Sequence, residues 1–111
     1  MPNSLRVLIV GGVACGPKAA SRLKRLCPSY DVTMIDKGHQ VSYGACGLPY
    51  YVEGTFPDVA MLMETPAAVA RNVPFFEKVK GFKTLTRTEA IRIDRERKVA
   101  RVRNLDSGVE E

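Results

Sequence analysis

The sequence predicts an α/β fold that opens with a β-α-β unit. Residues 5–10 form a short apolar run rich in β-branched side chains, typical of a buried parallel strand, and the run ends at Gly11 and Gly12. Residues 31–36 form a second such run. Between the two runs, apolar side chains recur at helical spacing and stop near Pro28. This order indicates two parallel strands joined by a right-handed helical crossover.

The middle of the chain predicts shorter elements. Residues 37–56 lose regular periodicity, and the glycines and Pro49 in this stretch indicate a compact, bent segment. Thr65 and Pro66 are the residue types that begin helices, so we expect a short helix through residues 67–71.

The end of the chain predicts a helical turn and a β-hairpin. Residues 75–80 suit one helical turn that ends at Gly81. Residues 89–94 and 99–104 alternate apolar and polar side chains around a turn at residues 95–98. The predicted strands are too few for a finished doubly wound sheet, so we expect residues 1–111 to be the amino-terminal part of a larger domain.

Composition limits the classes of partner. The 111 residues suit one small domain, and the formal charge of +5 comes from cations scattered along the chain. Nucleic-acid tails instead carry dense basic blocks between aromatic residues, so we expect no nucleic-acid partner and favour small anionic ligands.

The cysteines and the single histidine predict no metal site. Cys15, Cys27 and Cys46 show no C-x-x-C spacing, and His39 has no partner at zinc-finger spacing. The apolar run near the N-terminus is too short for a signal peptide or a membrane span. These thiols favour a reducing cytoplasm.

The glycine turn at residues 11–16 predicts a nucleotide site. It delivers a strand to a helix N-terminus, where free N–H groups can hold a pyrophosphate, and Asp36 ends the second strand, where a carboxylate can accept hydrogen bonds from a ribose. Alternatively, the glycines only permit tight packing and Asp36 caps a loop. The candidate cofactor-binding residues are Gly11, Gly12, Val13, Ala14, Gly16, Asp36 and Lys37.

Residues 42–50, S-Y-G-A-C-G-L-P-Y, are the most informative segment. Gly44 and Gly47 allow close backbone approach to a flat ligand, and Pro49 suits the first turn of a helix that begins just after Cys46. A cysteine at such a place would be reactive. The alternative is that Cys46 is a small buried apolar side chain.

This segment resembles the S-F-x-N-C-G-L-P-Y signature of coenzyme A-disulfide reductases, NADH-dependent polysulfide and persulfide reductases, and cysteine-sulfenate NADH oxidases, which are pyridine nucleotide-disulfide oxidoreductases. The resemblance extends over the whole chain and includes the G-G-V-A-x-G turn, where Val13 matches the family, the T-P segment expected to be helical, and the I-D-R-E hairpin. It implies a Rossmann-like FAD-binding half-domain. It also implies Cys46 as the catalytic residue and Ser42 as a substrate-binding residue.

The resemblance further implies an oxidoreductase that passes electrons from NAD(P)H through FAD to coenzyme A disulfide, coenzyme A persulfide or polysulfide. The NAD(P)H and dimerisation domains would lie outside this chain, the whole enzyme would be a homodimer, and the chain alone would be inactive. Val41 stands where a C-x-x-x-x-C pair would need its first cysteine, so only a single-cysteine cycle is available. An NADH oxidase with a cysteine sulfenic acid and a non-catalytic nucleotide-binding module stay open as alternatives.

Two positions depart from the family pattern. Ala45 stands where these reductases commonly have asparagine, which leaves the substrate-binding side chain at this position without its amide. Cys15 replaces a frequent glycine, and we expect it to be buried and structural.

Lys18, Arg22 and Arg25 share one side of the first helix. Such a stripe is generically a solvated surface. In the resembled reductases, the matching positions contact coenzyme A phosphates, and guanidinium groups suit that task. We therefore expect substrate-phosphate binding here, with Arg22 favoured above the other two.

Overall fold

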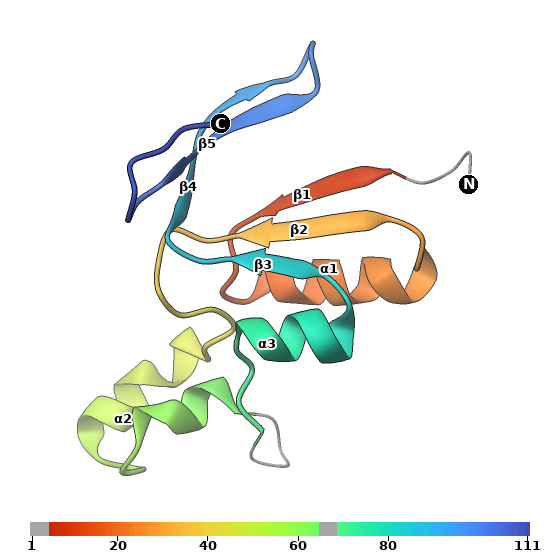
Figure 1. The fold of residues 1–111 in the computed structure, drawn as a ribbon. Coiled ribbons are helices and arrows are strands. Elements are labelled where there is room, and N and C mark those ends of the chain that lie inside the picture. The colour runs from red at the N-terminus through yellow and green to blue at the C-terminus, as the bar shows by residue number, and fades with distance from the viewer. Residues whose placement is uncertain (1–4, 65–68) are drawn as a thin grey trace.

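The computed structural model describes residues 5–64 and 69–111, and its centre is a parallel sheet. Strands β1 (Arg6–Val10), β2 (Asp31–Ile35) and β3 (Lys83–Leu85) pair in the order β1-β2-β3 (Figure 1). The β-α-β prediction is confirmed. The third strand was not predicted, because three residues are too short to show a period.

Helix α1 (Cys15–Leu26) connects the first two strands, and its buried residue Ala20 packs in the same cluster as Val32 and Met34 of β2. At its end, Lys24 Nζ donates hydrogen bonds to the carbonyl oxygens of Pro28 at 2.8 Å and Tyr30 at 2.9 Å, which closes the connection into β2. Within the part of the chain that the structure describes, no helix has the length and apolar character needed to cross a membrane.

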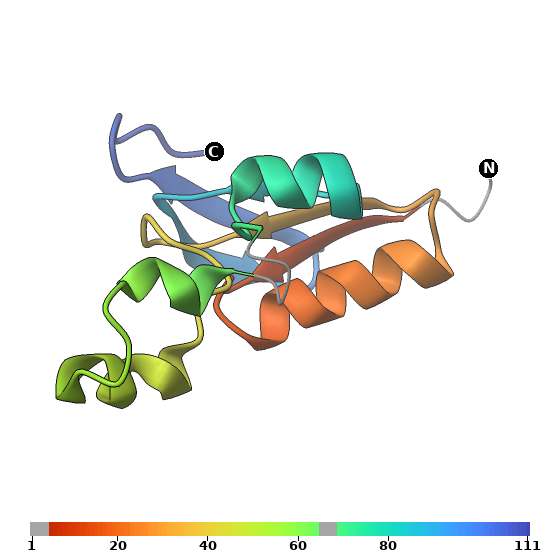
Figure 2. The ribbon, with the colours of Figure 1, turned by 90° about the horizontal axis from the view of Figure 1, so that it is seen from below.

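A second helical connection, α3 (Val73–Phe75), continues as the π-helical turn η3 (Phe76–Lys80) and leads into β3. Both crossovers lie on the same face of the sheet (Figure 2). The predicted helical turn over residues 75–80 is confirmed, and Gly81 ends it with a left-handed φ of 78°.

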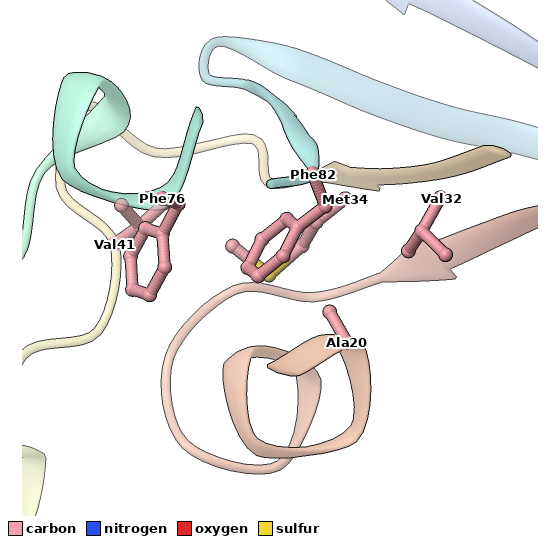
Figure 3. Close-up of a cluster of buried hydrophobic side chains, with 6 residues drawn as sticks. All are labelled: Ala20, Val32, Met34, Val41, Phe76 and Phe82. Atoms are coloured by element: carbon pink, nitrogen blue, oxygen red, sulfur yellow. The ribbon is translucent and has the colours of Figure 1, made fainter. Parts of the chain in front are cut away.

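The core lies between the sheet and these two helical segments (Figure 3). Phe76 and Phe82 stack with ring centroids 5.2 Å apart, and Met34 of β2 is fully buried. Burial of each such side chain contributes about 2 kcal/mol to stability. The buried cluster comprises Ala20, Val32, Met34, Val41, Phe76 and Phe82.

The helix expected over residues 67–71 is wrong where it can be checked. Thr65 and Pro66 lie outside the described residues, but Ala70 forms an isolated antiparallel bridge with Glu64. The helix start lies further on, where Asn72 Oδ1 accepts a hydrogen bond from the Phe75 N–H at 3.1 Å. A cap followed by a proline was the right signal, but the Asn72 cap and Pro74 provide it.

Residues 45–63 form a small helical lobe beside the sheet, drawn in yellow and green in Figure 1. It contains the 3₁₀ turn η1 (Ala45–Gly47), helix α2 (Leu48–Glu53) and the 3₁₀ helix η2 (Val59–Met63). The expected compact, bent segment is confirmed, and α2 begins just after Cys46 as predicted.

The predicted hairpin is confirmed. Strands β4 (Thr88–Asp94) and β5 (Val99–Asn104) pair antiparallel, with an irregularity in register between Ala90 and Arg92. The chain then returns alongside β5, since Val102 and Glu111 exchange backbone hydrogen bonds of 2.7 and 2.9 Å. The hairpin projects beyond the sheet at the end where β1 and β2 finish (Figure 1).

Candidate functional site

The glycine turn excludes a side chain at Gly16 and leaves little room for one at Gly12. A Cβ at Gly16 would lie 1.7 Å from the Gly11 carbonyl oxygen, and one at Gly12 would lie 3.0 Å from Val41. Gly11 has a φ of 104°, which side-chain-bearing residues rarely adopt. The glycines therefore bring the start of α1 directly against the end of β1.

The start of α1 has the properties of an anion site. No side chain forms a capping hydrogen bond at Ala14, and the first turn contains no acidic residue. No atom lies within 4 Å of a Cβ built on Gly11. A helix start whose N–H groups have no side-chain cap fits a pyrophosphate.

Asp36 organises the turn from the end of β2. Its carboxylate oxygens accept hydrogen bonds from the Gly12 N–H and the Gly38 N–H, each at 2.9 Å. The loop-capping alternative is therefore seen in the structure, but each carboxylate oxygen can accept a further hydrogen bond. Gly11, Asp36 and Lys37 also line a hollow of about 250 Å³ together with Thr88 of β4. This arrangement leaves room for a ribose beside Asp36.

Cys46 lies in the middle of the 3₁₀ turn η1 and is exposed. The turn is held by the Gly44 N–H, which donates to the Leu62 carbonyl at 2.8 Å, and by the Gly47 N–H, which donates to the Gly44 carbonyl at 2.8 Å. Thus the chain presents this thiol at its surface, and the reading of Cys46 as a buried apolar side chain does not hold.

Cys15 is also exposed, so the expectation that it is buried is wrong. It is the first residue of α1, where the chain leaves the glycine turn and the side chain projects from the helix start. Pro17, two residues further along the helix, is buried instead.

Ser42 connects the two motifs. Its N–H donates a hydrogen bond of 2.6 Å to the Gly12 carbonyl, so the glycine turn and the cysteine segment are joined directly. Ser42 is buried and has a φ of 54°, a conformation that costs a non-glycine residue about 1–2 kcal/mol. Such strain persists where surrounding contacts fix the backbone.

A groove of about 410 Å³ runs beside this junction. Ser42, Gly44 and Tyr43 lie on one side, and Phe75 and Phe76 lie on another. Its cationic lining residues are Lys18, Arg25, Arg71 and Lys80. The groove therefore combines positive charge with aromatic surface, which suits an anionic ligand that has a flat ring.

Two of the three cations in the predicted stripe line this groove. Arg22 is not among the lining residues, because it is rotated by about 40° from Lys18 around the helix while Arg25 is rotated by about 20° the other way. Ala45 is exposed on the cysteine turn, next to Gly44. Sequence reasoning missed Arg71 and Lys80, since nothing in their local spacing distinguishes them from other surface cations.

Among residues 5–64 and 69–111, no group of three or more His, Cys, Asp or Glu side chains could hold a metal ion. The organised groups are the nucleotide-type turn, the exposed thiol and the cationic groove. Gly44, which precedes the cysteine turn, lines the groove, whereas Cys46 itself is not among the lining residues. The arrangement suits a nucleotide at the glycine turn and an anionic ligand in a groove that adjoins the cysteine turn.

Comparison with known proteins connects this geometry to a family. The family model for pyridine nucleotide-disulphide oxidoreductases matches residues 5–111. The chain is 41% identical over 88 residues to an NAD(P)H sulfur oxidoreductase (CoA-dependent) of Pyrococcus abyssi, covering 79% of this chain and 18% of the relative. It is 32% identical over 100 residues to a coenzyme A disulfide reductase of Staphylococcus epidermidis, covering 89% of this chain and 21% of the relative.

The fold agrees with these relatives. The structure of an NAD-dependent persulfide reductase from A. fulgidus superposes with a TM-score of 0.91 at 40% identity, covering 96% of this chain and 19% of that one. The chain thus spans about a fifth of the length of the proteins it matches. Both the matched residues and the superposed fold show that the chain belongs to the pyridine nucleotide-disulphide oxidoreductase family.

Proposed function

We propose that residues 1–111 are the amino-terminal part of the FAD domain of an enzyme that uses NAD(P)H to reduce coenzyme A disulfide, coenzyme A persulfide or polysulfide. FAD, when bound, supplies the two-electron chemistry that passes electrons from NAD(P)H to sulfur. The glycine turn and the start of α1 would hold its pyrophosphate, and Asp36 with Lys37 would hold the adenosine ribose.

Cys46 is the group that reacts with substrate sulfur. Its thiolate attacks one sulfur of the bound disulfide, forms a mixed disulfide and releases the other sulfur as a thiolate. Two electrons that originate from NAD(P)H then restore the Cys46 thiolate and release the second thiol. The observation that supports this proposal is an exposed Cys46 on a glycine-bounded turn, joined by Ser42 to the nucleotide turn.

The cationic groove would bind the coenzyme A part of the substrate. Coenzyme A bears phosphates and an adenine ring, which match the guanidinium groups of Arg25 and Arg71 and the aromatic surface of Tyr43 and Phe75. Lys18 and Lys80 add point charges. Arg22 flanks the groove and contributes at longer range. Because Ala45 offers no amide, the sulfur end of the substrate would be held by the backbone of the turn and by Ser42.

The remaining domains would complete the enzyme. NAD(P)H would bind in a second nucleotide domain, and a dimerisation domain would join two copies into a homodimer. The three cysteines are unpaired within the described residues, which fits a reducing cytoplasm.

Replacement of Cys46 by serine in the complete enzyme tests this function. Cys46→Ser should abolish disulfide reduction, with a loss of at least about 1,000-fold, because a serine hydroxyl cannot form a mixed disulfide. FAD content, measured by absorbance, should stay at the wild-type level. Cys15→Ser and Cys27→Ser are matched controls that should retain turnover. Wild-type rates in Cys46→Ser would overturn the mechanism.

An NADH oxidase is the second candidate, since Cys46 is exposed and Ala45 lacks the amide typical of coenzyme A-disulfide reductases. In that enzyme, Cys46 would cycle through a sulfenic acid formed by a peroxide. Product analysis with oxygen as the only acceptor separates the two functions. Rapid oxidation of NADH coupled to reduction of oxygen to water, with no turnover of coenzyme A disulfide or polysulfide, would favour the oxidase.

A further inference from the structure

Arg71 contacts both the groove and the segment beneath Cys46. Its Nη2 donates to the Leu62 carbonyl at 3.2 Å, and its Nε lies 3.4 Å from the Met63 carbonyl. Its backbone N–H donates to the Met63 carbonyl at 2.7 Å. Arg71 is half-buried. Its side chain and its backbone N–H both donate to carbonyls at the end of η2, so this one residue holds that segment in place.

Leu62 in turn supports the cysteine turn. Its carbonyl accepts the Gly44 N–H at 2.8 Å, so Gly44 and Arg71 share one acceptor. Its side chain fills the space under Gly47, where an added Cβ would lie 2.5 Å from Leu62 Cδ2. Because Gly44 and Gly47 flank the turn that contains Cys46, displacement of Leu62 would displace the thiol.

The same Arg71 side chain lines the cationic groove with Lys18, Arg25 and Lys80. A guanidinium has five N–H donors in a rigid fork, and the Leu62 and Met63 carbonyls occupy two of them. The others are available to an anion in the groove. Among the described residues, Lys80 forms no hydrogen bond with η2, and its Nζ lies 5.9 Å from the centroid of the Phe75 ring. It therefore offers a control that removes a cation from the groove without a direct contact to the segment that supports the cysteine turn.

We propose that Arg71 is a positioning residue for Cys46, acting through Leu62, and that it links occupation of the groove by an anionic substrate to the geometry of the cysteine turn. The kinetic consequence of this inference rests on the proposed function. The structural link from Arg71 to the cysteine turn does not depend on that function. The two can therefore be tested separately.

Kinetics of the complete enzyme provide the first test. Arg71→Ala should lower kcat roughly tenfold with both coenzyme A disulfide and polysulfide, since a small misplacement of a reacting group has effects of this size or larger. Lys80→Ala should raise KM for coenzyme A disulfide and spare polysulfide. If Arg71→Ala instead raises only KM for coenzyme A disulfide, Arg71 is a substrate contact and the inference fails.

Hydrogen exchange of the same enzymes provides the second test. In Arg71→Ala, the backbone amides of the peptide that contains Gly44 and Gly47 should exchange roughly fivefold faster. The reason is that the Leu62 carbonyl, which accepts the Gly44 N–H, loses its hydrogen bond from Arg71. Adenosine 3′,5′-bisphosphate, a coenzyme A fragment without a thiol, should slow this exchange in the wild type and in Lys80→Ala, each at saturation, but not in Arg71→Ala. Unchanged exchange in Arg71→Ala would overturn the proposal.

Arg71→Lys is the second variant. Lysine keeps the charge in the groove but cannot span two carbonyls as a fork does, so it should reproduce the fall in kcat with little change in KM. Full activity in Arg71→Lys would contradict the positioning role. A wild-type enzyme with no reductase activity would defeat the proposed function, while the exchange measurements would still decide the link between Arg71 and the turn.

Discussion

At the residue scale, glycines set the geometry of the site. Gly16 permits α1 to start against the Gly11 carbonyl, and Gly47 permits the cysteine turn to pack on Leu62. The two glycines differ in what surrounds them. Gly16 faces backbone, which cannot move aside, whereas Gly47 faces the end of a flexible side chain.

Gly16→Ala should therefore be severely destabilising. With its Cβ 1.7 Å from the Gly11 oxygen, the turn and helix must separate, and we expect a loss of about 3 kcal/mol or more in the free energy of unfolding. FAD content should fall with it. Gly44→Ala is the matched control, because its Cβ would lie at an ordinary 3.5 Å from the Leu62 carbonyl oxygen. Denaturant unfolding of both variants is the measurement, and equal stability would contradict the packing argument.

At the element scale, local hydrogen bonds decide where helices begin. Helix α3 follows Asn72, whose side chain accepts a hydrogen bond from the Phe75 N–H and so caps the helix. The position of this start matters because α3 and η3 place Phe76 in the core and Lys80 in the groove.

Asn72→Ala should lower the free energy of unfolding by about 1 kcal/mol, the usual effect of removing a side-chain cap. Asn72→Asp should be close to wild type, since a carboxylate accepts the same hydrogen bond and suits a helix N-terminus. Thermal unfolding of the two variants compares them directly. If both lose stability equally, the cap is not what begins α3.

An ion pair between β5 and the segment that returns alongside it is sensitive to pH. Arg103 Nη2 lies 2.6 Å from Glu110 Oε1, and this hydrogen bond and the Arg103 charge hold the pKa of the Glu110 carboxyl below its ordinary value. A lowered pKa stabilises the fold above the ordinary glutamate pKa, and this contribution disappears as the pH falls through the lower folded value. Both groups are solvent-exposed, so salt should weaken the effect.

A comparison of the wild type with Glu110→Gln tests the direction of this pH dependence. The wild type should be slightly more stable than Glu110→Gln at neutral pH, and the difference should vanish under acidic conditions. NMR titration of Glu110 should also show its pKa return toward the ordinary value in Arg103→Gln. A Glu110 pKa that does not respond to Arg103→Gln would exclude the ion pair as the cause.

At the scale of the whole molecule, the chain leaves much apolar surface uncovered. Strand β1 is at an edge of the sheet, and its Leu8 and Val10 are exposed. The helical lobe likewise exposes Tyr50 and Val52, the latter at 82%. The relatives are about five times longer, so additional structure is available in them to cover such surfaces.

If the proposed function is right, the isolated chain should show no NAD(P)H-dependent reductase turnover and should bind FAD weakly, since its described residues form only one β-α-β unit with a glycine turn of the proposed cofactor site. Purified residues 1–111 can be assayed with NADH and polysulfide, and FAD retention can be measured by absorbance after gel filtration. The complete enzyme is the control and should be yellow. Robust turnover by the isolated chain would refute the division of function between domains.

The sequence by itself determined the local elements and indicated the candidate reactive groups. The run before Gly11, the turn that ends at Gly16 and the alternation in the hairpin each reflect a period or a backbone constraint that neighbouring residues specify. The signature around Cys46 was equally local. These features were predicted because each one depends on residues close together in the chain.

Only the tertiary structure decided how the separate motifs meet. The hydrogen bond from Ser42 to Gly12, the shared Leu62 acceptor and the groove that joins Arg25 with Arg71 and Lys80 all connect residues whose sequence separation gives no sign of contact. The same holds for exposure, since Cys15 was expected to be buried and is not. Local patterns specify backbone conformation, but packing of distant segments decides which side chains face a common site.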